Sequence, residues 1–336
     1  MQIDQNIEIL DSTLREGEQT PGVSFSVREK VILAKKLDLF GVDFIELGHP
    51  AVSSDVYEAV ERLNDLDLNA KKMVHGRAMK SDINDALAIG VRWIGIFYGT
   101  SPISLKHKFN IDQKTALNRI ESAIKYGKDK GLKLRFTAED ASRTEIEYLI
   151  EIGKLAQQSG ADRFSLADTV GCLTPMKTKA MVKRIVSELD IPIHLHSHND
   201  FGMATANSLT GFEAGAQCID VTVDGLGERC GLSPLAEIIA GLVNIYGSKT
   251  SDGFEKAFGV NFLGTVYFTE QIKNTNLFST YDPINEFPRV VMVTSEEHRL
   301  YNKIKLENQT YFGDFHDFGL LSGGQMEGYA YSKFLL

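Results

Sequence analysis

The sequence predicts an α/β fold, a (β/α)8 TIM barrel followed by a short C-terminal appended segment. The first observation is that eight short runs rich in apolar residues occur before about residue 225. The second is that helix-like segments fill the gaps between many of these runs, and strands that alternate with helices form parallel sheets with right-handed crossovers. The third is that eight such units in about 240 residues match the size of a closed barrel.

The eight predicted strands are residues 7–14, 43–47, 72–75, 93–98, 133–137, 163–167, 193–198 and 218–223. The helix predicted at 27–40 places its apolar residues near one face, and the helices predicted at 117–131 and 146–160 each end at a glycine suited to a helix C-terminus. The alternative is a doubly wound open sheet. No GxGxxG motif follows the first strand, which disfavours the dinucleotide-binding form of that fold.

The character of the chain changes near residue 250. Phe and Tyr become frequent, and the end of the chain is rich in Gly and Phe. A segment of this size and irregularity is a poor candidate for an independent domain. We therefore predict a catalytic barrel over residues 1–250 and a C-terminal subdomain or lid segment over residues 251–336.

Composition excludes several classes of protein. Asp and Glu outnumber Lys and Arg by 45 to 36, and no long basic run occurs, so neither nucleic acid nor an anionic membrane is an expected partner. No stretch approaches 18 consecutive apolar residues, so no membrane span is expected. The 3 cysteines form no CxxC pair, and the start of the chain lacks the pattern of a signal peptide. These features predict a cytoplasmic protein without a disulfide framework.

Three histidines alternate along the seventh predicted strand. His194, His196 and His198 share one face of that strand, because side chains on a strand alternate between its two sides. In a barrel the chemistry lies at the C-terminal ends of the strands, and two imidazoles two residues apart can bind one divalent cation there. The alternative is a hydrogen-bonded histidine cluster, and His194, the deepest of the three, is the best candidate for a structural role.

The first predicted strand ends in residues 11–19, DSTLREGEQ. A carboxylate from this stretch can complete the metal site that the histidines begin. The adjacent Arg15 is always charged and can bind a carboxylate or stabilise a developing oxyanion. The alternative is a capped turn whose charges are solvated.

Arg135, Thr137 and Glu139 share one face of the fifth predicted strand. An inward-facing arginine beside a hydroxyl is an anion receptor, and the alternative is a buried ion pair between Arg135 and Glu139. Polar residues also end the third and sixth strands, at His75 and Thr169. This convergence of polar side chains at one end of the barrel predicts an enzyme with a metal ion and an anionic substrate.

Six motifs occur in order on these predicted elements, and together they resemble those of one enzyme family. They are residues 11–19 (DSTLREGEQ), 44–47 (FIEL), 137–144 (TAEDASRT), 167–171 (ADTVG), 196–202 (HSHNDFG) and 225–231 (GLGERCG). The family is the metal-dependent barrel family of isopropylmalate, citramalate and homocitrate synthases, with the acyl-CoA lyases as distant relatives. The resemblance covers about residues 6–245.

This resemblance implies an enzyme that joins acetyl-CoA to a 2-oxo acid and then hydrolyses the thioester. It implies that Glu16, His196 and His198 bind a divalent cation, which Zn, Mn, Mg or Co could supply. It also implies that Arg15 polarises the ketone oxygen of the substrate. A 2-oxo acid chelates a cation through its carboxylate and ketone oxygens, so the physical chemistry agrees.

Within the family the chain is most similar to the homocitrate synthases. Glu16 and the stretch 231–235 (GLSPL) follow their pattern, and Arg135 and Thr137 match their receptor for the second carboxylate of 2-oxoglutarate. His75 matches a histidine that lines the same pocket. Gln19 and Thr169 complete the predicted substrate-binding set.

The sequence departs from the family at two places. Residues 48–50 read GHP, so His49 alters the expected pocket. The family also carries a catalytic histidine after the barrel, which here would be His298 or His316, and the register favours His298. If neither histidine is the base, Glu139 acting through a water is the expected substitute. Family members exchange C-terminal segments between subunits, so a homodimer is expected.

Three other functions are open on the sequence alone. One is an isopropylmalate- or citramalate-type synthase that uses another 2-oxo acid. Another is a lyase that runs the reverse cleavage with Cys230, which lies in the glycine-rich loop. The last is a metal-binding barrel that serves as a scaffold.

Overall fold

The computed structural model describes residues 7–247 together with 269–271, 278–281 and 288–291. The chain divides into two compact units, Met1–Phe254 and Glu255–Leu336. In the second unit, three described strands form an antiparallel sheet in the order β11-β10-β9, namely β9 (Thr269–Gln271), β10 (Phe278–Tyr281) and β11 (Pro288–Val291). The assignment of residues 251–336 as a lid segment stays a prediction.

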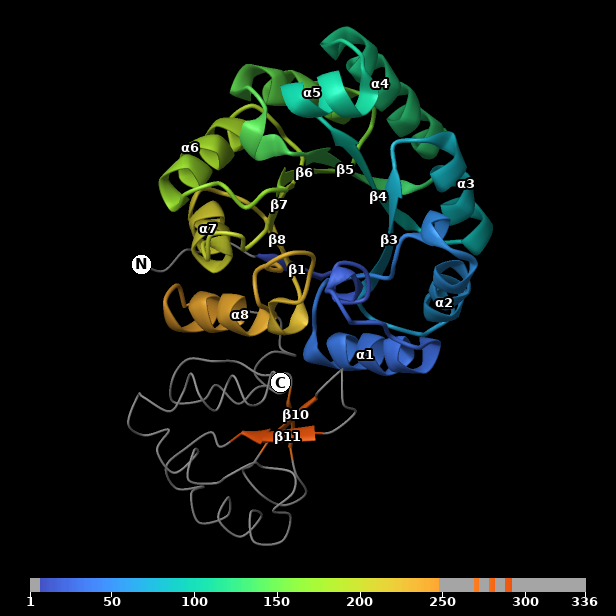
Figure 1. Ribbon diagram of the computed structural model, residues 1–336, viewed down its shortest axis with the longest axis vertical. Coiled ribbons are helices and arrows are strands. Elements are labelled where there is room, and N and C mark those ends of the chain that lie inside the picture. The colour runs from blue at the N-terminus through green and yellow to red at the C-terminus, as the bar shows by residue number, and fades with distance from the viewer. Residues whose placement is uncertain (1–6, 248–268, 272–277, 282–287, 292–336) are drawn as a thin grey trace, which may run out of the picture. The chain divides into compact units, whose positions relative to one another are not determined.

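Eight parallel strands form a closed barrel in chain order, as Figure 1 shows. They are β1 (Glu8–Asp11), β2 (Phe44–Glu46), β3 (Lys71–Arg77), β4 (Trp93–Gly99), β5 (Lys133–Glu139), β6 (Arg163–Asp168), β7 (Ile193–Ser197) and β8 (Cys218–Val221). The barrel closes where β1 pairs in parallel with β8, with Leu10 beside Asp220. The predicted TIM barrel is therefore confirmed.

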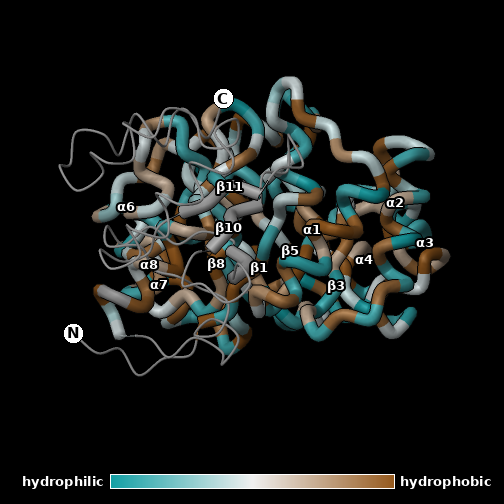
Figure 2. The backbone as a smooth tube through the Cα atoms, turned by 90° about the horizontal axis from the view of Figure 1, so that it is seen from below, coloured by the Kyte–Doolittle hydropathy of each residue, from teal (hydrophilic) through white to brown (hydrophobic). Residues whose placement is uncertain are grey.

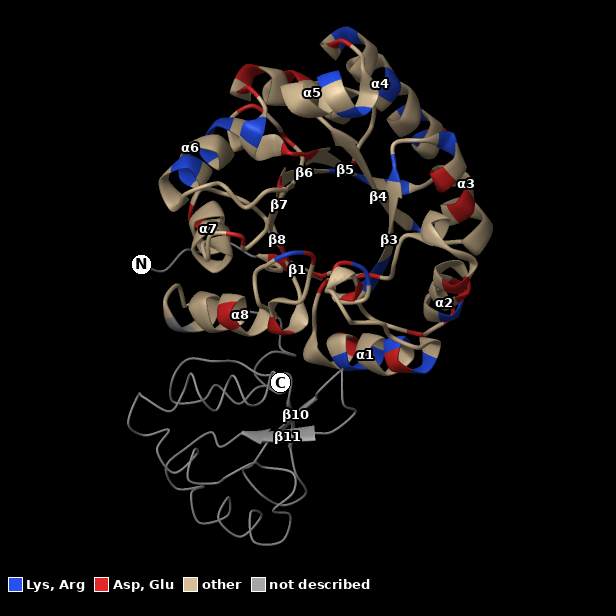
Figure 3. Cartoon of the chain, viewed as in Figure 1, with Lys and Arg blue, Asp and Glu red and all other residues tan. Residues whose placement is uncertain are grey.

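Eight helices surround the strands and alternate with them along the chain (Figure 1). They are α1 (Val27–Phe40), α2 (Ser54–Asn64), α3 (Lys80–Ile89), α4 (Gln113–Asp129), α5 (Ile146–Gln158), α6 (Pro175–Val186), α7 (Ala204–Glu213) and α8 (Leu235–Asn244). Apolar and polar segments alternate along these helices in Figure 2, which is typical of helices that pack one face on a core. Both acidic and basic residues occur along the surrounding helices (Figure 3).

The ends of the predicted helices follow ordinary capping chemistry. Ser26 and Glu29 form a reciprocal capping box at the start of α1, and Gly41 ends that helix in the left-handed conformation. The helix bounds predicted at 27–40 are therefore confirmed. α4 begins earlier than predicted because Asp112 caps its first turn by accepting a hydrogen bond from the Thr115 amide.

The interior of the barrel is apolar near the N-terminal ends of the strands. Leu10, Phe44, Met73 and Cys218 are fully buried against one another, and Trp93 packs on them. Short helical turns follow several strands at the opposite end, namely η1 (Gly17–Gln19), η2 (Pro50–Val52), η3 (Ser104–Phe109), η4 (Ala141–Arg143) and η5 (Val223–Gly225). This arrangement leaves the C-terminal end of the barrel for polar side chains. Among the described helices, none has both the length and the apolar character that crossing a membrane requires.

Candidate metal centre and substrate cavity

A cavity of about 280 Å³ lies at the C-terminal ends of the strands. Its lining residues are Arg15, Glu16, Gln19, His49, His75, Phe97, Arg135, Thr137, Glu139, Ala167, Thr169, His196, His198, Asp220 and Glu228. Every site residue predicted within the described part of the chain therefore borders the same cavity. His298 and His316 lie outside the described residues.

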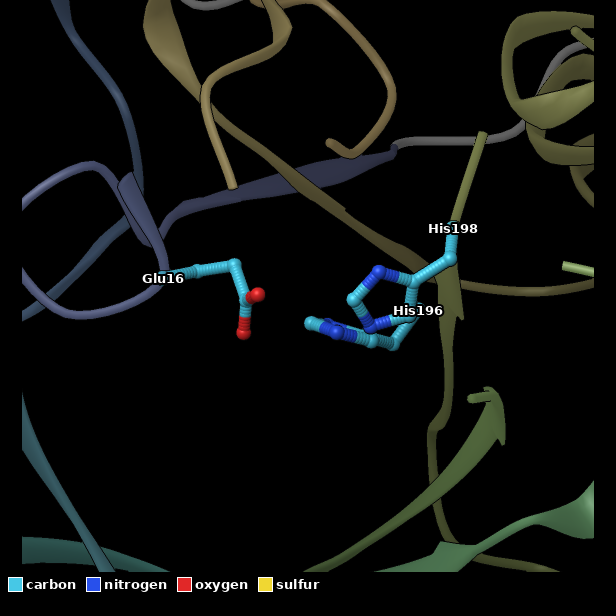
Figure 4. A group of neighbouring side chains, drawn as sticks. All are labelled: Glu16, His196 and His198. Atoms are coloured by element: carbon cyan, nitrogen blue, oxygen red, sulfur yellow. The ribbon is translucent and has the colours of Figure 1, made fainter. Parts of the chain in front are cut away.

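Glu16, His196 and His198 form a compact buried group within this cavity (Figure 4). Each offers one ligand-type atom, and these atoms all lie within 4.8 Å of one another. Glu16 immediately precedes η1, His196 lies on β7, and His198 follows the end of that strand. In Figure 4 the carboxylate of Glu16 points toward the two imidazoles. Side chains that are far apart in the sequence, near the first and seventh strands, therefore meet at one point.

The carboxylate of Glu16 is held in its ionised form. Burial raises its pKa, but the charge of Arg15, whose guanidinium donates to the carboxylate, brings the pKa below its usual value. The amide of Glu228 also donates to Glu16 Oε1 over 3.3 Å. An ionised carboxylate is the form that ligates a cation.

The hydrogen bonds of the histidines leave nitrogens available for a metal. His196 Nδ1 lies 3.1 Å from Asp220 Oδ2. Because a carboxylate accepts, Nδ1 donates, and Nε2 remains for ligation. Burial, together with the neighbouring His196, lowers the pKa of His198 to about 3, so its ring is neutral at pH 7. Its Nδ1 is buried and has no hydrogen-bond partner among the described residues.

These three side chains fit a divalent cation. The donor set has two neutral imidazoles and one carboxylate, which is a usual combination for catalytic metal sites and leaves coordination positions for substrate. An orphaned buried nitrogen on His198 is costly unless a ligand satisfies it. The group thus has the chemistry and the spacing of a metal site.

A second buried group, His194, Cys218 and Asp220, also brings ligand-type atoms within 4.8 Å of one another. Here His194 Nε2 lies 3.0 Å from Arg163 Nη1, and His194 Nδ1 lies 3.3 Å from Asp220 Oδ1. Since a guanidinium only donates, Nε2 accepts and Nδ1 carries the proton. Both ring nitrogens are thus occupied by protein partners, which supports the structural role predicted for His194.

A family model described as HMGL-like matches residues 6–255 of the chain. The chain belongs to the HMGL-like family of enzymes. It is 48% identical over 241 residues to a protein named homocitrate synthase from Pyrococcus horikoshii, a match that covers 72% of this chain and 66% of that protein. A second homocitrate synthase, from Sulfurisphaera tokodaii, is 48% identical over 246 residues, which are 72% of this chain and 54% of the relative. The match thus spans between half and two thirds of these relatives.

Solved structures confirm the fold of this HMGL-like barrel. An HMG-CoA lyase from Bacillus subtilis superposes with a TM-score of 0.68, covering 76% of this chain and 91% of that one. The two sequences are 20% identical, so this likeness concerns the fold alone.

Glu46 is a central residue of the site that the sequence did not single out. This carboxylate at the end of β2 is fully buried. It accepts hydrogen bonds from four side chains, namely Ser12 Oγ at 2.6 Å, Arg15 Nε at 2.8 Å, His75 Nδ1 at 3.1 Å and Arg135 Nη2 at 3.0 Å. Burial works against its charge, but Arg15 and the other cationic neighbours hold its pKa well below the usual range. The sequence feature that could have indicated Glu46 is its position as the one acidic residue inside the apolar run FIEL.

Asp220 on β8 is the second residue that the sequence did not single out. Its Oδ2 accepts from both His196 Nδ1 and Arg135 Nη1, the latter over 3.0 Å, while Oδ1 accepts from His194. Its carboxylate stays charged because Arg135 and the hydrogen bonds outweigh burial and lower the pKa. An aspartate inside the apolar run CIDV was the signal for this residue.

Arg135 is already paired with two carboxylates, so it is not a bare cation. The alternative ion pair with Glu139 is wrong, because the outer nitrogens of Arg135 bond Glu46 and Asp220, and Glu139 pairs with Lys108 at 2.7 Å. A Cβ at Gly95 would lie 3.0 Å from Arg135 Nη2, so the glycine gives the guanidinium room. Arg135 Nε and Thr137 Oγ1 are buried and have no hydrogen-bond partner among the described residues.

The glycine-rich loop after β8 is fixed against the metal group. Thr20 Oγ1 receives the amide proton of Gly227 over 2.8 Å and donates to the Gly227 carbonyl over 3.2 Å. A Cβ at Gly231 would lie 1.8 Å from the carbonyl oxygen of Gly225, so this turn requires glycine. The loop thereby brings the Glu228 amide to Glu16. Cys230 in the same loop is exposed and is absent from the cavity lining.

A larger cavity of about 600 Å³ adjoins the first one. Four cationic side chains line it, namely Arg77, Lys80, Lys108 and Arg119. Phe97 borders both cavities, and Lys108 bonds Glu139 of the first cavity. The two cavities are therefore separated by a shared wall of side chains.

Proposed function

We propose that this HMGL-like barrel condenses acetyl-CoA with a 2-oxo acid and then hydrolyses the thioester, with a dicarboxylate such as 2-oxoglutarate as the substrate and homocitrate as the product. The observation that carries this proposal is the buried Glu16, His196 and His198 group beside Arg15, in a cavity that also holds Arg135. Relatives named homocitrate synthase support the choice of substrate. The chain is thus proposed to be an acyltransferase.

The metal-binding group anchors the reactive end of the substrate. Glu16, His196 and His198 would hold a divalent cation, which when bound supplies a Lewis acid for the carboxylate and ketone oxygens of a 2-oxo acid. Arg15 lies beside this group and stabilises the negative charge that develops on the ketone oxygen when the carbon–carbon bond forms. Arg15 needs no reorganisation for this, because Glu16 and Glu46 both hold its guanidinium.

The distal carboxylate of the substrate binds at Arg135 and Thr137. Each has a buried donor without a described partner, and a buried donor of that kind is costly unless a ligand accepts from it. His75, Gln19 and Thr169 complete the wall around the acid. A substrate with an aliphatic end would leave both donors unsatisfied, which favours a diacid over a branched-chain acid.

The second cavity is the proposed binding place for acetyl-CoA. Coenzyme A is polyanionic and has a long, largely uncharged arm, and this cavity combines four cations with apolar walls. Phe97 lines both cavities, so a coenzyme bound here would lie next to the cavity that contains the metal group. Glu139 stands at the same wall and is proposed to take a proton through a water. His298 as the condensation base, and a homodimer that brings it to a neighbouring barrel, remain predictions.

A synthase of the isopropylmalate or citramalate type is the second candidate, because the metal group and Arg15 would serve any 2-oxo acid. The position of Cys230 argues against a lyase that uses this cysteine, because Cys230 is exposed and does not border the cavity.

A thiol-release assay with the full chain, a divalent metal, acetyl-CoA and a panel of 2-oxo acids tests these proposals. We expect the highest kcat/KM with 2-oxoglutarate and homocitrate as the product detected by mass spectrometry. Thiol release with 2-oxoisovalerate above any diacid would contradict the proposed substrate, and no thiol release with any acid would contradict the function.

A further inference from the structure

His49 occupies a fixed place at the rim of the substrate cavity. It directly precedes η2, and the backbone before it packs closely on α2, because a Cβ at Gly48 would lie 2.9 Å from Val60. The Gly48 carbonyl also accepts the amide proton of His75 over 2.8 Å. The imidazole of His49 therefore projects from a backbone that has little freedom to move.

The ring of His49 is held from behind by the buried carboxylate of Asp82. Its Nε2 lies 3.1 Å from Oδ2 of Asp82, whose side chain is 1% exposed. Asp82 in turn receives two hydrogen bonds from the Arg77 guanidinium, each of 2.9 Å. Although burial raises the pKa of Asp82, the hydrogen bonds from His49 and Arg77 bring it far below its usual value, so the carboxylate stays ionised. Nδ1 is the ring nitrogen that Asp82 does not occupy.

His49 continues an aromatic wall that faces the metal group across the barrel. Its ring centroid lies 5.8 Å from that of His75 and 6.3 Å from that of Phe97, and these two rings stack on each other at 4.8 Å. His75 lies on β3, which is four places from β7 in the closed eight-stranded order, so the two strands stand opposite each other. If the proposed metal group anchors the acid beside His196, its distal end is expected to extend toward this wall.

We propose that His49 is a specificity-determining residue that sets both the length and the distal polarity of the 2-oxo acid. This inference rests on the proposed function of the same cavity. The ring lines the cavity and is held by Asp82, so a longer acid would meet this side chain. In the imidazolium form, whose Nε2–H bonds Asp82, the Nδ1–H can donate to the distal carboxylate of the acid, where a phenyl ring would present only carbon. The preferred length of the acid should depend on the volume of the His49 side chain, and the preference for a polar distal group should depend on its ring nitrogen.

Two substitutions separate these contributions. His49→Ala removes the ring, so the ratio of kcat/KM for 2-oxoadipate to that for 2-oxoglutarate should rise by about 10- to 200-fold, the usual value of one methylene in a pocket. His49→Phe keeps the wall, so this length ratio should stay within about threefold of wild type. In that variant the preference for 2-oxoglutarate over the apolar acid 2-oxohexanoate should fall by at least about tenfold, as expected for a lost hydrogen bond to a charged group.

The same length and polarity preferences should appear in the ratios of the dissociation constants of these acids. Dissociation constants of the three acids are measured by calorimetry with the full chain loaded with Mn²⁺ and without acetyl-CoA. His107→Ala is the matched control, because His107 is exposed and borders neither cavity, and its ratios should equal those of wild type. Thermal unfolding of each variant confirms that it is folded.

The outcomes for the inference and for the proposed function differ. Unchanged length and polarity ratios in both folded His49 variants, beside an active wild type, would overturn the inference and leave the proposed function intact. A wild-type chain that binds the diacids but condenses none with acetyl-CoA would contradict the proposed function, and the binding ratios would still decide the role of His49.

Discussion

Asp220 Oδ2 accepts a hydrogen bond from His196 Nδ1 over 3.1 Å, so the second ring nitrogen of this predicted metal ligand is fixed by a buried carboxylate. The same oxygen accepts from Arg135 Nη1 over 3.0 Å. One carboxylate thus orients a residue at the metal end of the cavity and a residue at its distal end. Asp220 therefore links the metal end of the cavity to its distal end.

Asp220→Asn should weaken metal binding by about 10- to 100-fold, because the partner that orients a ligating histidine usually contributes that much. The dissociation constant for Zn²⁺ or Mn²⁺, measured by competition with a chromogenic chelator, is the readout. Asp168→Asn is the matched control. Asp168 is also a fully buried strand aspartate, but it accepts from the amides of Cys172 and Leu173. The control should lose stability and keep its metal affinity, and equal metal losses in both variants would contradict this role.

Much of the fold follows from the sequence because local patterns determine it. All eight barrel strands were predicted, although β1 ends at Asp11 rather than at residue 14. The reason is turn chemistry, because the Ser12 carbonyl accepts from the amides of Arg15, Glu16 and Gly17. β7 ends at Ser197, and His198 forms an isolated antiparallel bridge with Leu232 instead.

The partners of the buried charges could not be predicted from the sequence. Residues four apart on one strand are about 13 Å apart, which separates Arg135 from Glu139. The long side chain of Arg135 instead reaches across the interior of the barrel to carboxylates on β2 and β8, each three places from β5 in the strand order. Its partners Glu46 and Asp220 are 89 and 85 residues away in the chain. Only the closure and register of the barrel bring these three together.

Arg135→Ala should reduce kcat/KM for 2-oxoglutarate far more than for pyruvate, because pyruvate has no distal carboxylate. The difference should correspond to roughly 2–5 kcal/mol, as for the loss of a partner of a buried charge. Steady-state kinetics on both acids provide the measurement, and urea unfolding shows how much stability is lost with the pairs to Glu46 and Asp220. Arg143→Ala, at a half-exposed pair with Asp140, is the control. Equal losses on both acids would make Arg135 a structural residue.

The stability of the metal-free chain should fall between pH 6.5 and pH 4. Burial, with the nearby charge of Arg15, lowers the pKa of His75 from 6.5 to about 4. The unfolded chain thus takes up a proton in this window before the folded chain does, so the unfolding free energy decreases as the pH falls. His75→Gln should reduce this decrease by roughly 3 kcal/mol. Urea unfolding at pH 7 and pH 4 tests this, with His107→Gln as the exposed control, and identical pH dependence in all three proteins would refute it.

His298→Ala should lower turnover by roughly 10²- to 10⁴-fold while metal content stays intact, as expected for the loss of general acid–base catalysis. His298 lies outside the described residues, so this prediction rests on the sequence resemblance. His316→Ala is the matched comparison. If both variants keep full activity, Glu139 through a water becomes the base to test, and Glu139→Gln should then be the variant that loses turnover.

The metal content of the wild-type chain and of His196→Ala tests the central claim most directly. Both proteins are stripped with a chelator, reloaded with Zn²⁺ or Mn²⁺, desalted and measured by mass spectrometry together with thiol release from acetyl-CoA and 2-oxoglutarate. We predict one tightly bound cation per wild-type chain, because Glu16, His196 and His198 bring their ligand atoms within 4.8 Å of one another, and we predict loss of both the cation and turnover in the variant. A His196→Ala chain that retains its metal and its turnover would contradict the account.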